Sequence, residues 1–276
     1  MATVRIEKAR PHITLIWLDR PERLNAMSIE LCLELKAAFE DIAQDNFCRV
    51  VILTGAGRGF CSGLDLKDPS IIPNIDGLTV PRIGPRAIRI YSQLIPIMRH
   101  LPKPIIAAIN GAAYGGGMCL SLGADLRIAS ESAVFNATGI VNGLTSTELG
   151  ISWLLPRLIG AANSNDILLT GRRIDAAEAL RMGLVSRVVP DDRVLDEAFG
   201  IADEMCKYSP YGVEMTKQVL WANLETSSLA AAIEIEDRNQ IMLGMTDNLP
   251  EAITAFDQKR QPVYTDEPRR GIYPKA

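Results

Sequence analysis

Histidine is scarce in this 276-residue sequence, which contains only His12 and His100. Neither lies at metal-ligand spacing from another candidate ligand, and we expect both at the surface or at the edge of an element. The five cysteines are odd in number, scattered and free of any CxxC pair, which is typical of a reduced, cytoplasmic protein. The sequence therefore offers little for a Ser-His-Asp triad or a zinc site, and we expect no metal and no redox cofactor.

Long apolar runs and basic clusters are absent as well. No apolar run reaches the roughly 20 residues that span a membrane. The N-terminal residues alternate as a strand does, without the apolar segment of a signal peptide. The net charge of −4 includes no long basic run. We therefore expect neither a membrane nor a nucleic acid as a partner.

Glycine motifs that bind phosphate are missing too. No GxxxxGK[ST] occurs, and the segment Gly55–Phe60 fails to match GxGxxG because Phe60 stands where the last glycine belongs. The sequence does contain a glycine triplet at residues 115–117, behind a continuous apolar run from Ile105 to Ile109. This order predicts a buried strand, a glycine-rich turn and the start of a helix.

Two interpretations of the glycine triplet are open. Glycines let a backbone pass very close to another segment, and the helix start behind them presents unpaired N–H groups at the positive end of a dipole. This combination suits a negatively charged oxygen of a ligand or of a transition state. The alternative is that the glycines only permit tight packing of a helix against a strand.

The rest of the pattern predicts an α/β fold with an α-helical C-terminal region. We expect a core over residues 1–191 and a helical region over residues 192–276. Ser28 and Asp175 are predicted helix N-caps, residues 68–85 a mobile loop over a ligand, and residues 88–98 a helix kinked at Pro96. The predicted strands are 4–8, 13–18, 50–53, 105–109, 126–129, 134–135 and 185–189, with a helix at 176–182, four helices within 192–260 and an extended segment after 261.

Several segments, taken in order, resemble the signatures of the crotonase, or enoyl-CoA hydratase/isomerase, superfamily. The first is Phe60-Cys-Ser-Gly-Leu-Asp-Leu-Lys67, and the second joins Ile109-Asn-Gly-Ala-Ala-Tyr-Gly-Gly-Gly117 to Gly123-Ala-Asp125. Glu148-Leu-Gly150 with Leu155-Pro-Arg-Leu-Ile-Gly160 resembles the region that follows, and Phe256-Asp-Gln-Lys-Arg260 is similar to the C-terminal motif. Each motif alone is loose, whereas their order along nearly the whole chain is specific.

The resemblance implies a spiral of ββα turns that assembles as a homotrimer or as a homohexamer, a dimer of trimers, through the helical region. It also implies an acyl-CoA thioester as substrate, with no cofactor beyond the coenzyme A that the substrate carries. Two backbone N–H groups in the family hold the thioester oxygen as it becomes an enolate, and by motif match these belong to Leu64 and Gly116.

The same match gives the residues expected to contact CoA or the acyl group. Residues 62–66 are expected to be strand-like, and Lys67 has the alternative interpretation of a solvated surface lysine. The expected contacts are Leu24, Asn25, Ala26, Ser62, Asp65, Leu66, Lys67, Tyr114, Phe256 and Lys259.

The sequence departs from the family's hydratases at two positions. These enzymes use two glutamates, and the matching positions here hold Cys119 and Gly139, neither of which moves a proton in the required way. Glu148 is the remaining candidate base, because it precedes Pro156 by the same eight residues as the single carboxylate of the Δ3,Δ2-enoyl-CoA isomerases. This match requires a one-residue insertion in the preceding loop.

Apolar neighbours of Glu148 are expected to raise its pKa toward neutrality. Its alternative role is a carboxylate that complements the dipole of the helix that follows. Two functions stay open. One is an enoyl-CoA hydratase/isomerase of fatty acid metabolism, with isomerisation favoured because only one carboxylate is present. The other is an acyl-CoA-binding protein without catalysis.

Overall fold

The computed structural model describes residues 2–265 except 69 and 71, and these residues form two compact units that divide between Ala202 and Asp203. The first unit is α/β and the second is helical, as predicted. The division falls inside helix α7 (Val194–Met205). Within the described residues no helix is long and apolar enough to cross a membrane.

The larger sheet of the first unit has the strand order β1-β2-β3-β5-β7-β10. Only the β1–β2 hairpin is antiparallel, and β2, β3, β5, β7 and β10 run parallel. Every residue of β3 and β5 is buried, as their unbroken apolar runs predict for strands covered on both faces. The bounds are β1 Val4–Arg10, β2 Ile13–Leu18, β3 Val50–Gly55, β5 Ile105–Ile109, β7 Leu126–Ser130 and β10 Arg187–Val189.

A smaller sheet, in the order β4-β6-β8-β9, alternates with the larger one along the chain. Each of β3, β5 and β7 is followed by a short strand of the smaller sheet, so every turn of the chain adds one strand to each sheet. This repeat is the predicted spiral of turns. The bounds are β4 Gly59–Cys61, β6 Ala112–Tyr114, β8 Val134–Asn136 and β9 Ile174–Asp175.

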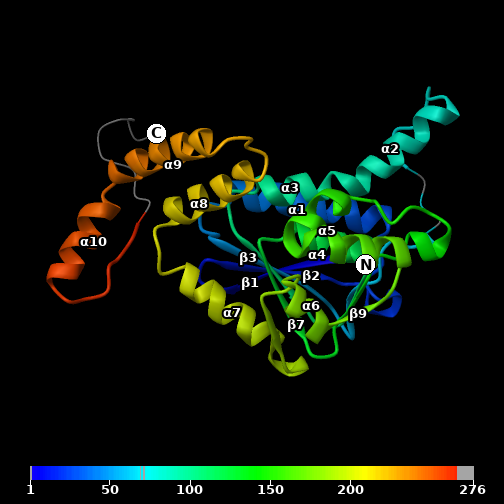
Figure 1. The fold of residues 1–276 in the computed structure, drawn as a ribbon, viewed down its shortest axis with the longest axis horizontal. Helices are drawn as coiled ribbons and strands as arrows, with labels where there is room; N and C mark the ends of the chain where they lie inside the picture. The colour runs from blue at the N-terminus through cyan, green and yellow to red at the C-terminus, as the bar shows by residue number, and fades with distance from the viewer. Residues whose placement is uncertain (1, 69, 71, 266–276) are drawn as a thin grey trace. The chain divides into compact units, whose positions relative to one another are not determined.

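Helices of the first unit stack along one side of the larger sheet, where Figure 1 shows α1, α3, α4 and α5. The side chains of Ser28 and Asp175 accept the N–H groups of Leu31 and Glu178, which confirms both predicted N-caps. The bounds are α1 Ile29–Gln44, α3 Leu94–His100, α4 Gly116–Gly123, α5 Ile151–Thr170 with a kink at Gly160, α6 Ala176–Met182, and the 3-10 turns η1 Pro21–Arg23, η2 Ile140–Asn142 and η3 Asp191–Arg193.

Four predictions of secondary structure are wrong. A helix, α2 (Val80–Ser92), begins inside the predicted loop 68–85, and it is separate from α3 rather than joined to it by a kink at Pro96. Pro81 and Pro96 both lie in the first turn of a helix, where a missing N–H costs no intrahelical hydrogen bond. Residues 62–66 form no strand apart from an isolated bridge between Leu64 and Met27, and β10 starts at Arg187 rather than at 185.

The second unit consists of the end of α7 with α8 (Pro210–Asn223), α9 (Leu229–Gly244) and α10 (Asn248–Asp257), so the four predicted helices are confirmed. Few of its described side chains are buried, Lys217, Asn248 and Ala255 among them. Many large apolar ones are exposed, including Leu220, Leu229, Ile241, Met245, Ile253 and Phe256. The predicted extended segment after residue 261 lies mostly outside the described residues.

Candidate active site

The two glycine-containing signatures meet through their backbones. Met27 donates its N–H to Gly63 O at 2.7 Å and accepts the N–H of Asp65 at 3.1 Å, a bridge that does not use the N–H of Leu64. Gly63 has a φ of +87°, and a Cβ there would lie 2.7 Å from Tyr114 O and 3.3 Å from Gly116 N. Only glycine therefore lets the first signature come so close to the second.

The glycine triplet contains one glycine that packing requires and one that begins a helix. A Cβ on Gly117 would lie 2.1 Å from Cys61 O, so this glycine is required by packing. Gly116, in contrast, is the first residue of α4, where an N–H has no intrahelical acceptor. The N–H of Gly116 is thus left at the positive end of the helix dipole, beside Gly63.

Glu148 reaches the same glycine turn from a different loop. A Cβ on Gly115 would lie 3.3 Å from Glu148 Oε1 and 2.6 Å from Thr138 Oγ1. The backbone of Glu148 is held by two donors, the N–H of Ile151 at 2.9 Å and the thiol of Cys119 at 3.6 Å, both to its carbonyl oxygen. The carboxylate is therefore brought beside the residue that precedes the Gly116 amide.

Burial raises the pKa of Glu148 above its ordinary value, and no other cause contributes to the shift. Within the described part of the chain the carboxylate has no hydrogen-bond or ion-pair partner. The pKa of the neighbouring Cys119 thiol is raised well above its usual range by burial and, second, by the charge of Glu148. The thiol is therefore neutral, which leaves Glu148 as the group here with a pKa shifted toward the range of a general base.

The two positions of the hydratase glutamates are closed to carboxylates. Cys119 is fully buried on α4. A Cβ on Gly139 would lie 2.0 Å from Thr145 O and 2.7 Å from Thr145 C, which no real side chain tolerates. A carboxylate at position 139 is excluded by the path of the backbone.

The side chains of Asn25 and Asp65 hold the predicted CoA loops together. Asn25 is fully buried and donates to Ala56 O at 2.9 Å and to Gly59 O at 2.8 Å. Asp65 accepts from Arg20 at 2.9 Å and from Arg23 at 2.6 Å. Burial alone would raise its pKa, but hydrogen bonds from Arg23, the Lys67 N–H and Arg20 hold the pKa of Asp65 below its usual value. These polar atoms are committed to the protein, so any contact of either residue with CoA would come from its backbone.

The other predicted contacts differ in exposure. Ser62 donates its N–H to Leu24 O at 3.0 Å, which ties the two loops, and Ala26 is buried. Leu66 and Lys67 are exposed, and half-buried Tyr114 lies beneath the guanidinium of Arg173 at 5.8 Å. Phe256, 83 % exposed, and Lys259 lie at the end of α10 in the second unit, and their contact with CoA stays a prediction.

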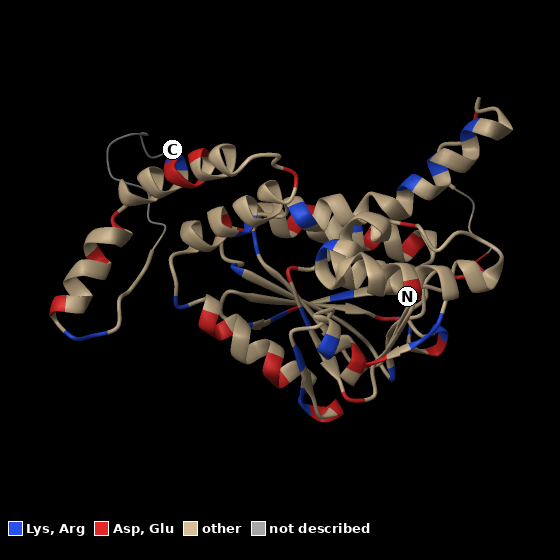
Figure 2. Ribbon diagram, viewed as in Figure 1, with Lys and Arg blue, Asp and Glu red and all other residues tan. Residues whose placement is uncertain are grey.

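Two exposed surfaces are not evident from the sequence. The loop that carries Glu148 also exposes Ile140, Val141 and Leu144. On α2, Arg82, Arg86 and Arg89 are exposed at helical spacing in a segment without acidic residues, visible as the blue bands on that helix in Figure 2. This spacing is readable in the sequence only once residues 80–92 are known to be helical.

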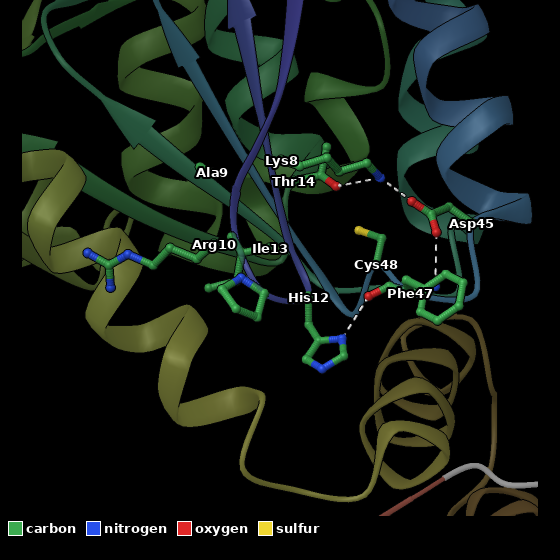
Figure 3. A pocket seen from close by; sticks show the side chains of 10 residues that line it. Lys8, Ala9, Arg10, His12, Ile13, Thr14, Asp45, Phe47 and Cys48 are labelled. Carbon is green, nitrogen blue, oxygen red and sulfur yellow. Dashed lines mark hydrogen bonds and ion pairs between the residues drawn. The ribbon is translucent and has the colours of Figure 1, made fainter.

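A cavity of about 570 Å³ lies elsewhere, at the tip of the β1–β2 hairpin. In Figure 3 Lys8 reaches between Thr14 and Asp45, and the ring of His12 points to Phe47 O, 2.9 Å away. Its lining includes none of the predicted site residues. Within the described ranges no group of His, Cys, Asp and Glu is suited to hold a metal ion.

The model of the enoyl-CoA hydratase/isomerase family matches residues 8–267. A probable enoyl-CoA hydratase of Mycobacterium tuberculosis, EchA12, is 46% identical over 268 residues, 97% of this chain and 94% of the relative. The 1,2-epoxyphenylacetyl-CoA isomerase of Escherichia coli is 35% identical over 90% of this chain and 93% of the relative.

Solved structures agree with the sequence comparison. A probable enoyl-CoA hydratase/isomerase of Mycobacterium abscessus superposes with a TM-score of 0.91 at 44% identity, over 96% of this chain and all of that one. A monofunctional enoyl-CoA isomerase of M. smegmatis reaches a TM-score of 0.72 at 43% identity, over 84% of this chain and 99% of that one. The chain belongs to the enoyl-CoA hydratase/isomerase family, as its motifs predict.

Proposed function

We propose that the protein is an enoyl-CoA isomerase that moves a carbon–carbon double bond of an acyl-CoA thioester with one carboxylate. The amides of Leu64 and Gly116 bind the thioester oxygen, and Glu148 is the base. The observation that carries the proposal is the position of Glu148 Oε1. It lies 3.3 Å from the point that a Cβ on Gly115 would occupy, and Gly115 immediately precedes the Gly116 amide. Its raised pKa supports the proposal, because a base works best with a pKa near the working pH.

In this mechanism Glu148 removes a proton from the α-carbon of a 3-enoyl-CoA. The electrons of that C–H bond pass into a dienolate, whose negative oxygen accepts hydrogen bonds from the two amides. Protonated Glu148 then returns the proton to the γ-carbon, which leaves a 2-enoyl-CoA and the ionised carboxylate. No water is consumed, and one group both takes and gives the proton.

Hydration is the second candidate, favoured by the names of relatives such as EchA12. Adding water across a double bond needs an acid and a base arranged about one water molecule. The neutral, buried thiol of Cys119 and the closed position at Gly139 argue against that arrangement. An acyl-CoA-binding protein without catalysis is the third, and the unpartnered carboxylate of Glu148 argues against it.

For the remainder of the ligand we propose contacts from Leu24, Ala26, Ser62, Leu66, Lys67 and Tyr114, with Asn25 and Asp65 acting through the loops they hold. Contacts of Phe256 and Lys259 with CoA are kept as a proposal. The three exposed arginines of α2 would attract the phosphates of CoA at long range. The exposed aliphatic residues beside Glu148 would suit an apolar acyl group.

We also propose a cytoplasmic homotrimer or homohexamer. The five cysteines are free thiols, which fits a reducing compartment. The exposed apolar side chains of the second unit need a covering partner, and helical faces of this kind mark protein interfaces. Light scattering at micromolar concentration tests the assembly, and a monomer mass would contradict it.

The decisive test compares Glu148→Gln with the wild type on 3-enoyl-CoA isomerisation and 2-enoyl-CoA hydration. The amide keeps the shape but cannot accept the proton, so isomerisation should fall at least roughly 100-fold, while the affinity for a CoA ester stays nearly constant. Glu131→Gln is the matched control, because Glu131 is exposed and should leave both rates unchanged. Full activity of Glu148→Gln, or a wild type that hydrates and does not isomerise, would refute the proposal.

A further inference from the structure

Thr138 brings a second polar side chain to the place where Glu148 meets the glycine turn. A Cβ on Gly115 would lie 2.6 Å from Thr138 Oγ1 and 3.3 Å from Glu148 Oε1. The separation of the two oxygens therefore cannot exceed the sum of these distances. Gly115, with a φ of +49°, is the residue that leaves room for both. The hydroxyl and the carboxylate thus lie together immediately before the Gly116 amide.

Neither oxygen has a protein partner within the described residues. The structure gives the Thr138 hydroxyl and the Glu148 carboxylate no hydrogen bond and no ion pair, although the backbone oxygen of each residue is hydrogen-bonded. A hydroxyl has one proton to donate, and an ionised carboxylate only accepts. The two groups are therefore complementary when Glu148 is charged.

No other charged group competes for the carboxylate among the residues that the structure describes. From α4 the titratable group that faces Glu148 is the Cys119 thiol, which burial keeps neutral and whose proton goes to the Glu148 carbonyl oxygen. The helix that follows, α5, begins at Ile151 with no acidic residue in its first turn. Besides the dipole of α5, a hydrogen bond from Thr138 is thus available to stabilise the negative charge.

We propose that Thr138 is a positioning residue for Glu148. When the carboxylate is ionised, the Thr138 hydroxyl donates a hydrogen bond to one of its oxygens and leaves the other directed at the substrate. The bond is charge-assisted and breaks when Glu148 takes up a proton. It therefore favours the ionised base and fixes the direction of the carboxylate while the proton moves between two carbons. The inference rests on the proposed role of Glu148.

The test uses two substitutions of matched size. Thr138→Val keeps the shape and removes the hydroxyl, whereas Thr138→Ser keeps the hydroxyl. The pKa of Glu148 is read directly, from the carboxyl resonances of 13C-glutamate-labelled protein, with Glu148→Gln to assign the signal. Loss of a hydrogen bond to the charged form should raise the pKa by about one unit in Thr138→Val. Thr138→Ser should titrate as the wild type does.

Kinetics supply the second readout. In Thr138→Val the pH midpoint of the acid limb of kcat/KM for isomerisation should rise by the same amount. At neutral pH, kcat should fall roughly tenfold, with KM unchanged. Thermal melting confirms that the variants fold, and Thr138→Ala replaces the valine variant if that one does not. An unchanged Glu148 pKa in the folded variant that lacks the hydroxyl overturns the proposal, as does an equal shift in Thr138→Ser.

The two proposals fail separately. If Glu148→Gln is inactive and Thr138→Val leaves the pKa unchanged, the base is established and the positioning role of Thr138 is refuted. If Glu148→Gln keeps full activity, the role of Glu148 as base is refuted, and the positioning role falls with it even where Thr138→Val shifts the pKa.

Discussion

The two halves of the candidate site are built in opposite ways. The half that would bind the thioester oxygen is made of backbone, and its glycines are enclosed so tightly that a methyl group at Gly63 or Gly117 would overlap a neighbouring carbonyl. The half that would move the proton depends on the side chain of Glu148, in a loop with several exposed aliphatic residues. The backbone fold sets the geometry of the half that would bind the thioester oxygen, whereas single side chains set the chemistry of the half that would move the proton.

The strongest test of this contrast removes the N–H of Gly116 and pairs it with a control variant that adds the same Cβ contact. Gly116→Pro deletes an N–H at the first position of a helix, where proline is tolerated, and the rate should fall roughly 100- to 1000-fold. Gly116→Ala is the control, because its Cβ meets the same flexible Met27 Sδ and the N–H remains. Equal rates of the two folded variants would contradict the assignment of the Gly116 amide to the oxyanion site.

The second test adds a carboxylate at position 119, which matches one of the two hydratase glutamates, and asks whether hydration appears. Cys119→Glu places a carboxylate in a fully buried position beside Glu148, which should lower the free energy of unfolding by about 3 kcal/mol or more. It should not gain hydration, because position 139 has no room for the second carboxylate. Urea unfolding and a crotonyl-CoA assay, with Cys119→Ala for comparison, measure both. A stable variant with rapid hydration would contradict this.

The next test concerns the ion pairs of Asp65 with Arg20 and Arg23. It asks whether these side chains position the loops of the proposed oxyanion site. Asp65→Asn removes two ion pairs from a buried carboxylate and should cost about 2 kcal/mol of the free energy of unfolding. Since the pKa of Asp65 is lowered in the folded state, the difference from wild type should shrink as the pH falls through that pKa. Unfolding curves at several pH values measure it.

The raised pKa of Glu148 predicts a stability effect of the opposite sign. The folded state binds this proton more tightly than the unfolded state does, so the carboxylate favours folding at low pH and loses that contribution as the pH rises through the raised pKa. Glu148→Gln should therefore be more stable than the wild type at neutral pH and lose this advantage in acid. Melting temperatures across pH check this, and an advantage that grows in acid would contradict it.

The smallest expected effect concerns the arginines of α2. Replacing Arg82 and Arg89 by glutamine should raise the KM for a CoA ester roughly two- to fivefold at low salt, and the difference should vanish at high salt because the attraction is screened. Arg86 is left in place because it also donates to Asn74 O. A difference in KM that persists in high salt would point to direct contact instead.

The parts of the site that sequence could predict are those set by local pattern. The glycine triplet, the helix start at Gly116 and the N-cap at Ser28 are each defined by residues close together in the chain. The ion pairs of Asp65 with Arg20 and Arg23 join loops more than 40 positions apart in the sequence, and no local sequence pattern predicts them. The place of Thr138 beside Gly115 depends on how one loop crosses another. The helix over 80–92 is hard to predict from sequence, because Pro81 and Pro85 are typical of helix breaks although both lie within it.

The close packing of Gly63 against Tyr114 and Gly116 has a consequence for the thermodynamics of binding. The backbone segments that carry the amides of Leu64 and Gly116 are packed together as the chain folds, so a thioester bound as proposed would not have to order either loop. The conformational entropy of that arrangement is lost once, during folding, and not again at each encounter with substrate. In the proposed mechanism such a preorganised pair of donors would meet the developing enolate without reorganisation, which is the condition under which hydrogen bonds lower a reaction barrier most.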